Sequence, residues 1–288
     1  MDVITSDGVR LHVVDQRPQS SRVPAAPGLH PAPLESGEPD TVLWLQGLNA
    51  PAAAWTVQIA HFARTHRSIA PDQRGVGRSD APSGPYTTRR LAEDAVNILD
   101  ACGVQRAHVV GLSLGGAAAQ ELALGFPERV RTLALLATFP GPSPRSGALL
   151  QAWRALYPHA HATPALREAW EKQAYAWLFT DKFWRAEANV RAALRFAATQ
   201  PAQSVSGFQG QVDAALAHDA RARLPSLRVP TLVLHGVLDQ LAPAAGAEEL
   251  AALIPGALLQ LVPEVGHAVN LEAQRVVHAA LRELWGRG

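Results

Sequence analysis

Cysteine is almost absent from this chain of 288 residues, since Cys102 is the only one. A single thiol cannot form an intramolecular disulfide, and it cannot complete a metal site built from cysteines. Lysine is also rare, occurring only at 172 and 182, and the arginines are scattered among acidic residues, so the formal net charge is only +1. That scattered charge excludes the basic stripe of a nucleic-acid-binding protein. We expect no metal, no organic cofactor and no nucleic-acid partner.

Long apolar runs are missing as well. No segment reaches the roughly 18 uninterrupted apolar residues of a membrane-spanning helix. The first residues, Met1 to Asp7, lack the basic start and apolar run of a secretory signal, which predicts a cytoplasmic protein without a membrane partner. Hydrophobic residues make up 48% of the chain and charged residues 18%, so a large core can form. The sequence contains no pattern that sets an oligomeric state.

Short apolar runs alternate with amphipathic stretches from residue 41 onward. Runs that are apolar on both faces and separated by helices indicate a mostly parallel sheet covered on both sides, the doubly wound α/β plan. The predicted strands span 41–45, 68–70, 107–112, 132–137, 231–235 and 258–262. The predicted helices lie near 52–64, 88–101, 115–125, 244–254 and 270–285. A hairpin over 4–14, with Asp7-Gly8 as its turn, precedes them.

Two segments interrupt this alternation. Residues 16–40 contain six prolines and no apolar period, which is typical of an exposed loop. Residues 143–218 continue as helical patterns without a strand, and they hold four of the seven tryptophans. We interpret 143–218 as an inserted helical cap on a core made of 1–142 and 219–288. Most of its aromatic side chains should form the interior of the cap, and a minority should face a ligand.

The strongest motif is Gly111-Leu112-Ser113-Leu114-Gly115, a G-x-S-x-G between an apolar strand and an Ala-rich helix. A serine on so tight a turn adopts strained backbone angles that expose its hydroxyl, and larger neighbours would collide with the strand and helix. Ser113 is therefore the candidate nucleophile. The Leu114 N–H at the start of the helix would stabilise an oxyanion on a substrate carbonyl.

A serine hydroxyl needs a base that accepts its proton. His267 follows the last predicted strand and precedes the last helix, and loops at the carboxyl ends of parallel strands are where such a sheet builds its site. The other histidines fit structural positions, among them His235 at a strand end. Asp239, directly after the strand over 231–235, is the candidate that orients His267, and the chain order Ser, Asp, His fits this type of site.

The loop after the first parallel strand supplies the remaining candidates. Gln46-Gly47-Leu48-Asn49 bends at Gly47, and we nominate the Leu48 N–H as the second oxyanion donor. The candidate substrate contacts are Asn49, Phe139 and Trp177.

Taken together, these motifs resemble the α/β-hydrolase superfamily over nearly the whole chain except 16–40. Asp72-Gln73-Arg74-Gly75-Val76-Gly77-Arg78-Ser79 is similar to its D-x-R-G-x-G-x-S segment, and Pro127-Glu128-Arg129-Val130 is similar to its P-E-R-V turn. The resemblance implies structural roles for Asp72 and Arg74. It is closest to the capped serine hydrolases that include enol-lactonases, small carboxylesterases and carbon–carbon bond hydrolases. The usual His-Gly after the first parallel strand is Gln46-Gly47 here.

These residues predict hydrolysis of a small carboxylic ester or lactone through an acyl-enzyme. Because a serine occupies the position of the nucleophile, the resemblance disfavours haloalkane dehalogenase and epoxide hydrolase chemistry, which uses a carboxylate. A carbon–carbon bond hydrolase or a cofactor-free perhydrolase would use the same three residues. A non-catalytic member that binds a ligand beneath the cap is the alternative of a different class.

Overall fold

The computed structural model describes residues 1–18, 40–160 and 162–288, so most of the predicted 16–40 loop lies outside the described residues. One eight-stranded sheet runs through the molecule in the order β1-β2-β4-β3-β5-β6-β7-β8. β1 and β2 form a hairpin, β2 is antiparallel to β4, and all other neighbours are parallel. The strands are β1 (Asp2–Ile4), β2 (Arg10–Gln16), β3 (Thr41–Leu45), β4 (Arg67–Pro71), β5 (Ala107–Leu112), β6 (Val130–Leu136), β7 (Thr231–Gly236) and β8 (Leu258–Val262).

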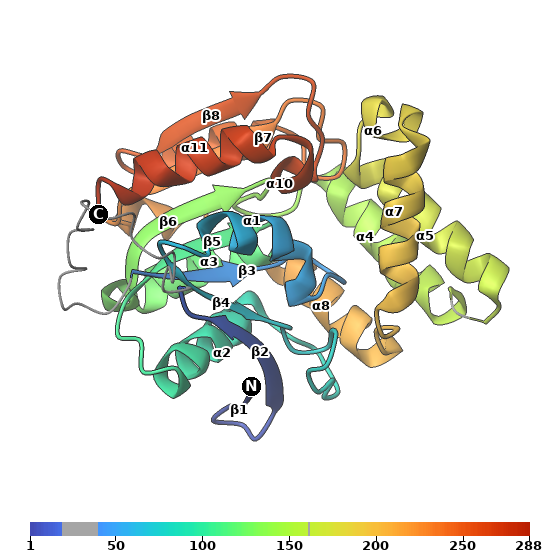
Figure 1. Ribbon diagram of the computed structural model, residues 1–288, viewed down its shortest axis with the longest axis horizontal. Helices are drawn as coiled ribbons and strands as arrows, with labels where there is room; N and C mark the ends of the chain where they lie inside the picture. The colour runs from blue at the N-terminus through green and yellow to red at the C-terminus, as the bar shows by residue number, and fades with distance from the viewer. Residues whose placement is uncertain (19–39, 161) are drawn as a thin grey trace, which may run out of the picture.

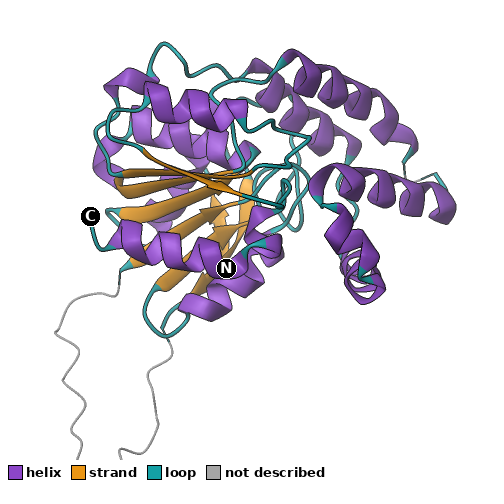
Figure 2. Ribbon diagram, turned by 90° about the horizontal axis from the view of Figure 1, so that it is seen from above, coloured by secondary structure: helices purple, strands orange, loops and turns teal. Residues whose placement is uncertain are grey.

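Helices cover both faces of this sheet, which confirms the predicted doubly wound plan (Figure 2). Side chains alternate across each central strand: in β3, Leu43 and Leu45 pack on one face, while Val42 and Trp44 pack on the other. The first face is covered by α2 (Thr88–Ala101), α3 (Leu114–Gly125) and α9 (Ala245–Leu253). The second face is covered by α1 (Thr56–Phe62) and α11 (Gln274–Trp285).

Several predicted boundaries differ from the structure. The hairpin turn is not Asp7-Gly8 alone, because β1 ends at Ile4 and β2 begins at Arg10, leaving a five-residue loop closed by the Thr5 N–H on the Val9 carbonyl at 2.9 Å. The helix expected near 52–64 begins as a 3-10 turn over Ala52–Trp55. The helix expected over 270–285 is split into α10 (Val269–Glu272) and α11 at Ala273, whose backbone leaves the helical region.

Every element that the structure describes between β6 and β7 is a helix. We call residues 143–218 the β6–β7 insertion. It contains α4 (Pro144–Leu156), α5 (Pro164–Leu178), α6 (Asp181–Arg185), α7 (Glu187–Thr199) and α8 (Val205–Ala217) with a short 3-10 turn over Tyr157–His159, and a further 3-10 turn over Leu224–Ser226 follows it. The insertion lies beyond the carboxyl ends of the parallel strands (Figure 1). α8 buries seven residues and packs on α3 and α4, whereas α6 and α7 bury none. None of the described helices is long and apolar enough to cross a membrane.

Candidate active site

Ser113 lies on the sharp turn between β5 and α3, as the G-x-S-x-G motif predicts. Its backbone has φ 54° and ψ −119°, a conformation that residues other than glycine rarely adopt. Two contacts hold it there: its N–H donates to the Leu136 carbonyl at 3.0 Å, and its carbonyl accepts the Thr138 hydroxyl at 2.7 Å. The flanking structure therefore imposes the strained turn on the serine.

The glycines of this turn are required by close packing. A Cβ at Gly111 would lie 2.4 Å from the Gly115 carbonyl oxygen, and one at Gly115 would lie 2.2 Å from the Leu45 carbonyl oxygen. Both distances are far below van der Waals contact, so helix α3 can approach β3 and β5 only because these side chains are missing. At Gly47 a Cβ would lie 3.2 Å from the Cβ of Ser113, which places the loop after β3 directly against the candidate nucleophile.

His267 and Asp239 come together from the loops after β8 and β7. The Nδ1 atom of His267 lies 2.7 Å from Oδ2 of Asp239, and both residues are buried. The other carboxylate oxygen accepts the N–H groups of Leu241 at 2.9 Å and Ala242 at 2.8 Å. Burial alone raises the pKa of the Asp239 carboxyl, but the rings of His267 and His235 lower it more, to about 2. The carboxylate is therefore charged at neutral pH and holds the proton on Nδ1 of His267.

His235 is a second partner of the same carboxylate, and sequence analysis gave it only a structural position. Its Nε2 atom lies 3.0 Å from Oδ2 of Asp239 and 2.7 Å from the Ala242 carbonyl oxygen. Since both neighbours are acceptors, Nε2 carries the proton. His235 is fully buried at the end of β7, four residues before Asp239, and that spacing was the only signal in the sequence.

Ser113 and His267 line one cavity, which thus brings the predicted nucleophile and base to the same space. No hydrogen bond joins the Ser113 hydroxyl to His267 or to any other residue that the structure describes. In proteins without substrate such contacts are often long and shorten only when the substrate binds. The structure therefore supplies the shared location of Ser113 and His267 and the contact between His267 and Asp239.

The two nominated oxyanion donors flank Ser113. Leu48 and Leu114 both line the cavity, one from the loop after β3 and the other from the first turn of α3. N–H groups in the first turn of a helix have no partner within the helix. The Leu48 N–H finds no acceptor among the described residues. The Gly47 N–H donates to the side-chain oxygen of Gln46 at 2.8 Å, so this glutamine helps to fix the bend.

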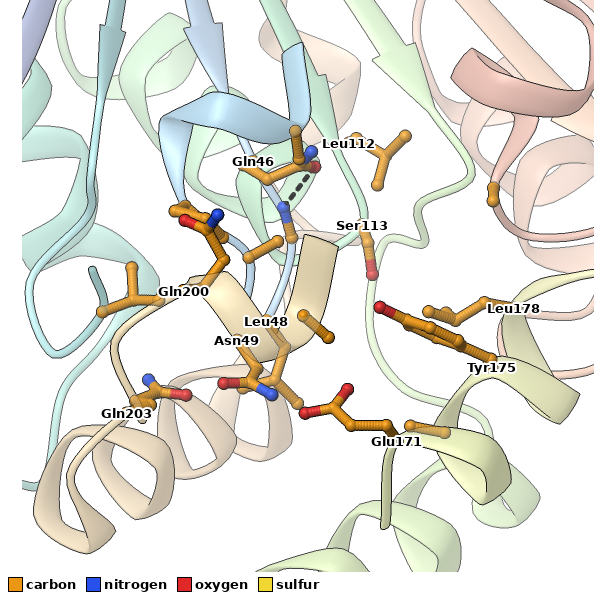
Figure 3. A pocket seen from close by; sticks show the side chains of 18 of the residues that line it. Gln46, Leu48, Asn49, Leu112, Ser113, Glu171, Tyr175, Leu178, Gln200 and Gln203 are labelled. Carbon is orange, nitrogen blue, oxygen red and sulfur yellow. Dashed lines mark hydrogen bonds between the residues drawn. The ribbon is translucent and has the colours of Figure 1, made fainter. Parts of the chain in front are cut away.

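The cavity has a volume of about 770 Å³ and is lined mainly by apolar side chains of the loops and the β6–β7 insertion (Figure 3). Of the candidate substrate contacts, Asn49 and Phe139 line it. Trp177 is not among its described lining residues. Its ring faces the guanidinium of Arg145 instead, with 5.4 Å from Cζ of the arginine to the ring centroid. The insertion instead contributes aromatic rings that sequence analysis did not select, namely Trp153, Tyr157, Trp170, Tyr175, Phe179, Phe196 and Phe208.

Asp72 and Arg74 hold loops and do not line the cavity. The Asp72 carboxylate accepts the Ala52 N–H at 2.7 Å and the Arg78 N–H at 2.9 Å. Arg74 forms a buried ion pair with Asp94 at 2.5 Å. These contacts agree with the structural roles that the family resemblance implies.

The His267 loop is fastened to the insertion. The Glu272 carboxylate accepts the Gly266 N–H at 2.9 Å and the Thr180 hydroxyl at 2.6 Å. Next to it, the Ala268 N–H donates to the Leu178 carbonyl at 2.9 Å. Ala268 is thus bonded directly to the end of α5, and Gly266 is linked through Glu272 to Thr180, the residue before α6. Among the described residues, no group of three or more His, Cys, Asp or Glu side chains is placed to hold a metal ion.

Comparison with known proteins places the chain in a family. The alpha/beta hydrolase fold family matches residues 40–274. RutD of Azorhizobium caulinodans, whose name gives carbamate hydrolysis as an unproven activity, is 34% identical over 235 residues, or 80% of this chain and 84% of RutD. The 2-hydroxymuconate semialdehyde hydrolase of Pseudomonas putida is 30% identical over 277 residues, or 91% of this chain and 92% of that enzyme.

Solved structures agree with this placement. A hydrolase from Pseudomonas aeruginosa PA01 superposes with a TM-score of 0.83 and 29% identity, covering 99% of this chain and 98% of that one. The enol-lactonase from Burkholderia xenovorans LB400 shares the fold, with a TM-score of 0.81, 24% identity and 99% coverage of both chains. The chain is therefore a hydrolytic enzyme that belongs to the alpha/beta hydrolase fold family.

Proposed function

We propose that the chain is a serine hydrolase that cleaves a small carboxylic ester or lactone through an acyl-enzyme. The observation that carries the proposal is the buried 2.7 Å contact between Asp239 and His267 at the wall of a cavity shared with Ser113. A carboxylate bound to Nδ1 leaves Nε2 of the histidine unprotonated, and this nitrogen can then accept the serine proton. In this proposal the insertion, over 143–218, acts as a cap on the core formed by 1–142 and 219–288.

The proposed reaction has two halves. Oγ of Ser113 attacks the substrate carbonyl while Nε2 of His267 takes its proton, and the negative charge on the carbonyl oxygen is stabilised by the N–H groups of Leu48 and Leu114. The C–O bond then breaks, and the imidazolium returns the proton to the leaving alcohol. In the second half, water gives a proton to His267 and attacks the acyl carbonyl. Collapse releases the carboxylic acid and restores the Ser113 hydroxyl.

A carbon–carbon bond hydrolase is the second candidate, and the similarity to the 2-hydroxymuconate semialdehyde hydrolase favours it. The two candidates differ in the bond broken and in the leaving group. A carbon–carbon bond hydrolase expels a carbanion or enol equivalent, whereas an esterase or lactonase expels an alcohol. Turnover of 2-hydroxymuconate semialdehyde can be monitored by the loss of its absorbance. Its rate should be compared with the rates for a panel of p-nitrophenyl esters and lactones. Faster turnover of the semialdehyde would favour the second candidate.

Replacement of Ser113 by alanine tests the proposed nucleophile. The variant should lose ester turnover and labelling by a fluorophosphonate probe while unfolding at the same temperature as the wild type. Ser206, an exposed serine on α8, provides the matched control, since Ser206→Ala should keep both turnover and labelling. Full esterase activity in Ser113→Ala would refute the acyl-enzyme route.

A further inference from the structure

Glu171 is an acidic side chain that points into the mostly apolar cavity from α5 (Figure 3). It forms no hydrogen bond or ion pair with any described residue. Arg167, one turn earlier on the helix, donates instead to the backbone carbonyls of Ala197 at 3.0 Å and Gln200 at 3.3 Å. Lys172, the next residue along the helix, pairs with Glu168 at 2.6 Å. Burial raises the pKa of the Glu171 carboxyl more than the attraction of Arg167 lowers it. Glu171 is therefore the one acidic residue among the described residues that line the cavity, and Arg167, which lines it as well, forms no ion pair with it.

Gln203 presents a second acceptor without a partner. Its side chain is only 7% exposed, and its Nε2 donates to Oε1 of Gln211 at 3.0 Å. The orientation of both amides is fixed, because Oε1 of Gln211 also accepts the Asn49 N–H at 3.0 Å and its Nε2 donates to the Arg74 carbonyl at 3.0 Å. Oε1 of Gln203 is left buried with no donor among the described residues. A buried acceptor without a donor is unfavourable, and a ligand donor would remove that cost.

The side chain of Asn49 completes this group. In the view of Figure 3 its amide is drawn between the side chains of Gln203 and Glu171, and all three residues line the cavity. The Asn49 side chain makes no hydrogen bond with the described residues, although its backbone N–H is held by Gln211. We call Glu171, Gln203 and Asn49 the acceptor corner. It offers a carboxylate and two amide oxygens to whatever occupies the cavity.

The chemistry of the acceptor corner selects one kind of ligand group. An ammonium group has three N–H donors and no acceptor, so it suits acceptor oxygens on the wall of a cavity. It also supplies a positive charge that can bond directly to the Glu171 carboxylate, and a charge-assisted hydrogen bond is stronger than a neutral one. A carboxylate or a phosphate would be repelled by Glu171, and a purely apolar group would leave the buried oxygen of Gln203 unsatisfied.

We propose that the acceptor corner binds a primary amino group of the substrate, so that the enzyme selects amino-substituted esters or lactones. This inference rests on the proposed esterase or lactonase function, because it assigns the part of the substrate that lies away from the Ser113 hydroxyl.

A pair of isosteric esters tests the selectivity. In p-nitrophenyl 6-aminohexanoate an ammonium group stands where p-nitrophenyl heptanoate has a terminal methyl group. The ratio of their kcat/KM values should favour the amino ester in the wild type and fall by about tenfold or more in Glu171→Gln, the loss expected for a hydrogen bond to a charged group. Glu168→Gln is the matched control, because Glu168 lies on the same helix but is exposed and paired with Lys172 at 2.6 Å. An unchanged ratio in Glu171→Gln would overturn the inference.

A binding measurement separates this inference from the proposed function. Calorimetric titration of the Ser113→Ala protein with hexylamine and with 1-hexanol requires no turnover. Hexylamine should bind at least about tenfold more tightly than 1-hexanol, and the preference should disappear when Glu171→Gln is added. Equal affinities in the Ser113→Ala protein would overturn the inference. Retained hydrolysis by Ser113→Ala would refute the proposed function instead, while the amine titration would still decide the role of the acceptor corner.

Discussion

The central strands and the outer helices of the β6–β7 insertion differ in how their residues are used. Every residue of β3, β5 and β7 is buried. By contrast, α6 and α7 have no buried residue, and α5 has only Trp170. Yet α5 and α7 supply a large share of the cavity wall, including Glu171 and Phe196. The strands form the buried core of the fold, whereas α5 and α7 direct apolar side chains into the cavity.

The difference suggests a division of labour. In the proposed function, Ser113, Asp239 and His267 stand on loops that the buried strands position, so their geometry is set by close packing. The substrate would meet mostly residues of the insertion, where fewer contacts constrain each side chain. Changes in the core should therefore alter stability or turnover, and changes in the outer helices should alter substrate preference with little loss of stability.

The largest effect should come from Asp239→Asn. An amide in place of the carboxylate can donate to the histidine and favours the tautomer with the proton on Nε2, which cannot accept the serine proton. We expect kcat for a p-nitrophenyl ester to fall by about 10⁴-fold with KM little changed. Steady-state kinetics, with circular dichroism to confirm folding, would measure this. Near-normal kcat in a folded variant would remove Asp239 from the proposed mechanism.

Truncation of one apolar side chain in each region tests the comparison directly. Leu43 is fully buried in β3, so Leu43→Ala should lower the free energy of unfolding by about 2–5 kcal/mol. Phe196 on α7 is 38% exposed and borders the cavity, so Phe196→Ala should cost less than about 1 kcal/mol while raising KM for an apolar ester. Urea unfolding and ester kinetics measure the two quantities. Equal losses of stability would contradict the distinction.

A smaller effect should appear where the insertion joins the core. His218 follows α8 and contacts the Thr88 hydroxyl at 3.0 Å and the side-chain oxygen of Gln120 at 3.3 Å. Burial lowers the pKa of His218 to about 4, below the value of 6.5 that an exposed histidine has. Between these values the unfolded chain binds a proton that the folded chain does not, so stability is full above about pH 6.5 and falls as the pH is lowered.

From about pH 7.5 to pH 5, this one group should remove on the order of 2 kcal/mol from the free energy of unfolding. Urea unfolding at both pH values measures the loss. His218→Gln should make the dependence shallower by that amount, whereas His159→Gln, at an exposed position, should leave it unchanged. If His218→Gln showed the same pH dependence of the free energy of unfolding as the wild type, His218 would not be the source of that dependence.

The sequence predicted the buried sheet better than the contacts between loops. Strands that are apolar on both faces leave few alternatives, and the helix expected over 88–101 begins and ends as predicted. Ser113 could be selected as the candidate nucleophile because its motif encodes a local backbone conformation. His235 was missed because its contact with Asp239 depends on how the chain turns after β7, which no short pattern encodes.

The orientation of side chains on the outer helices was equally hard to predict. Trp177 and Tyr175 lie two residues apart on α5, but only Tyr175 lines the cavity. An amphipathic pattern gives the faces of a helix without saying which face meets the cavity and which meets a neighbouring element. The acceptor corner combines residues from the loop after β3, from α5 and from the loop before α8, so it becomes visible only in three dimensions.

The hydrogen bonds that Glu272 accepts from Gly266 and Thr180, and that Ala268 donates to Leu178, have a mechanical consequence. They make the residues on either side of His267 part of the same rigid joint as the end of α5. The outer helices cannot move away from the core independently at this point. Such a movement would break those hydrogen bonds or displace the His267 imidazole. In the proposed function, a displacement of α5 that widens the cavity would therefore also move the catalytic base.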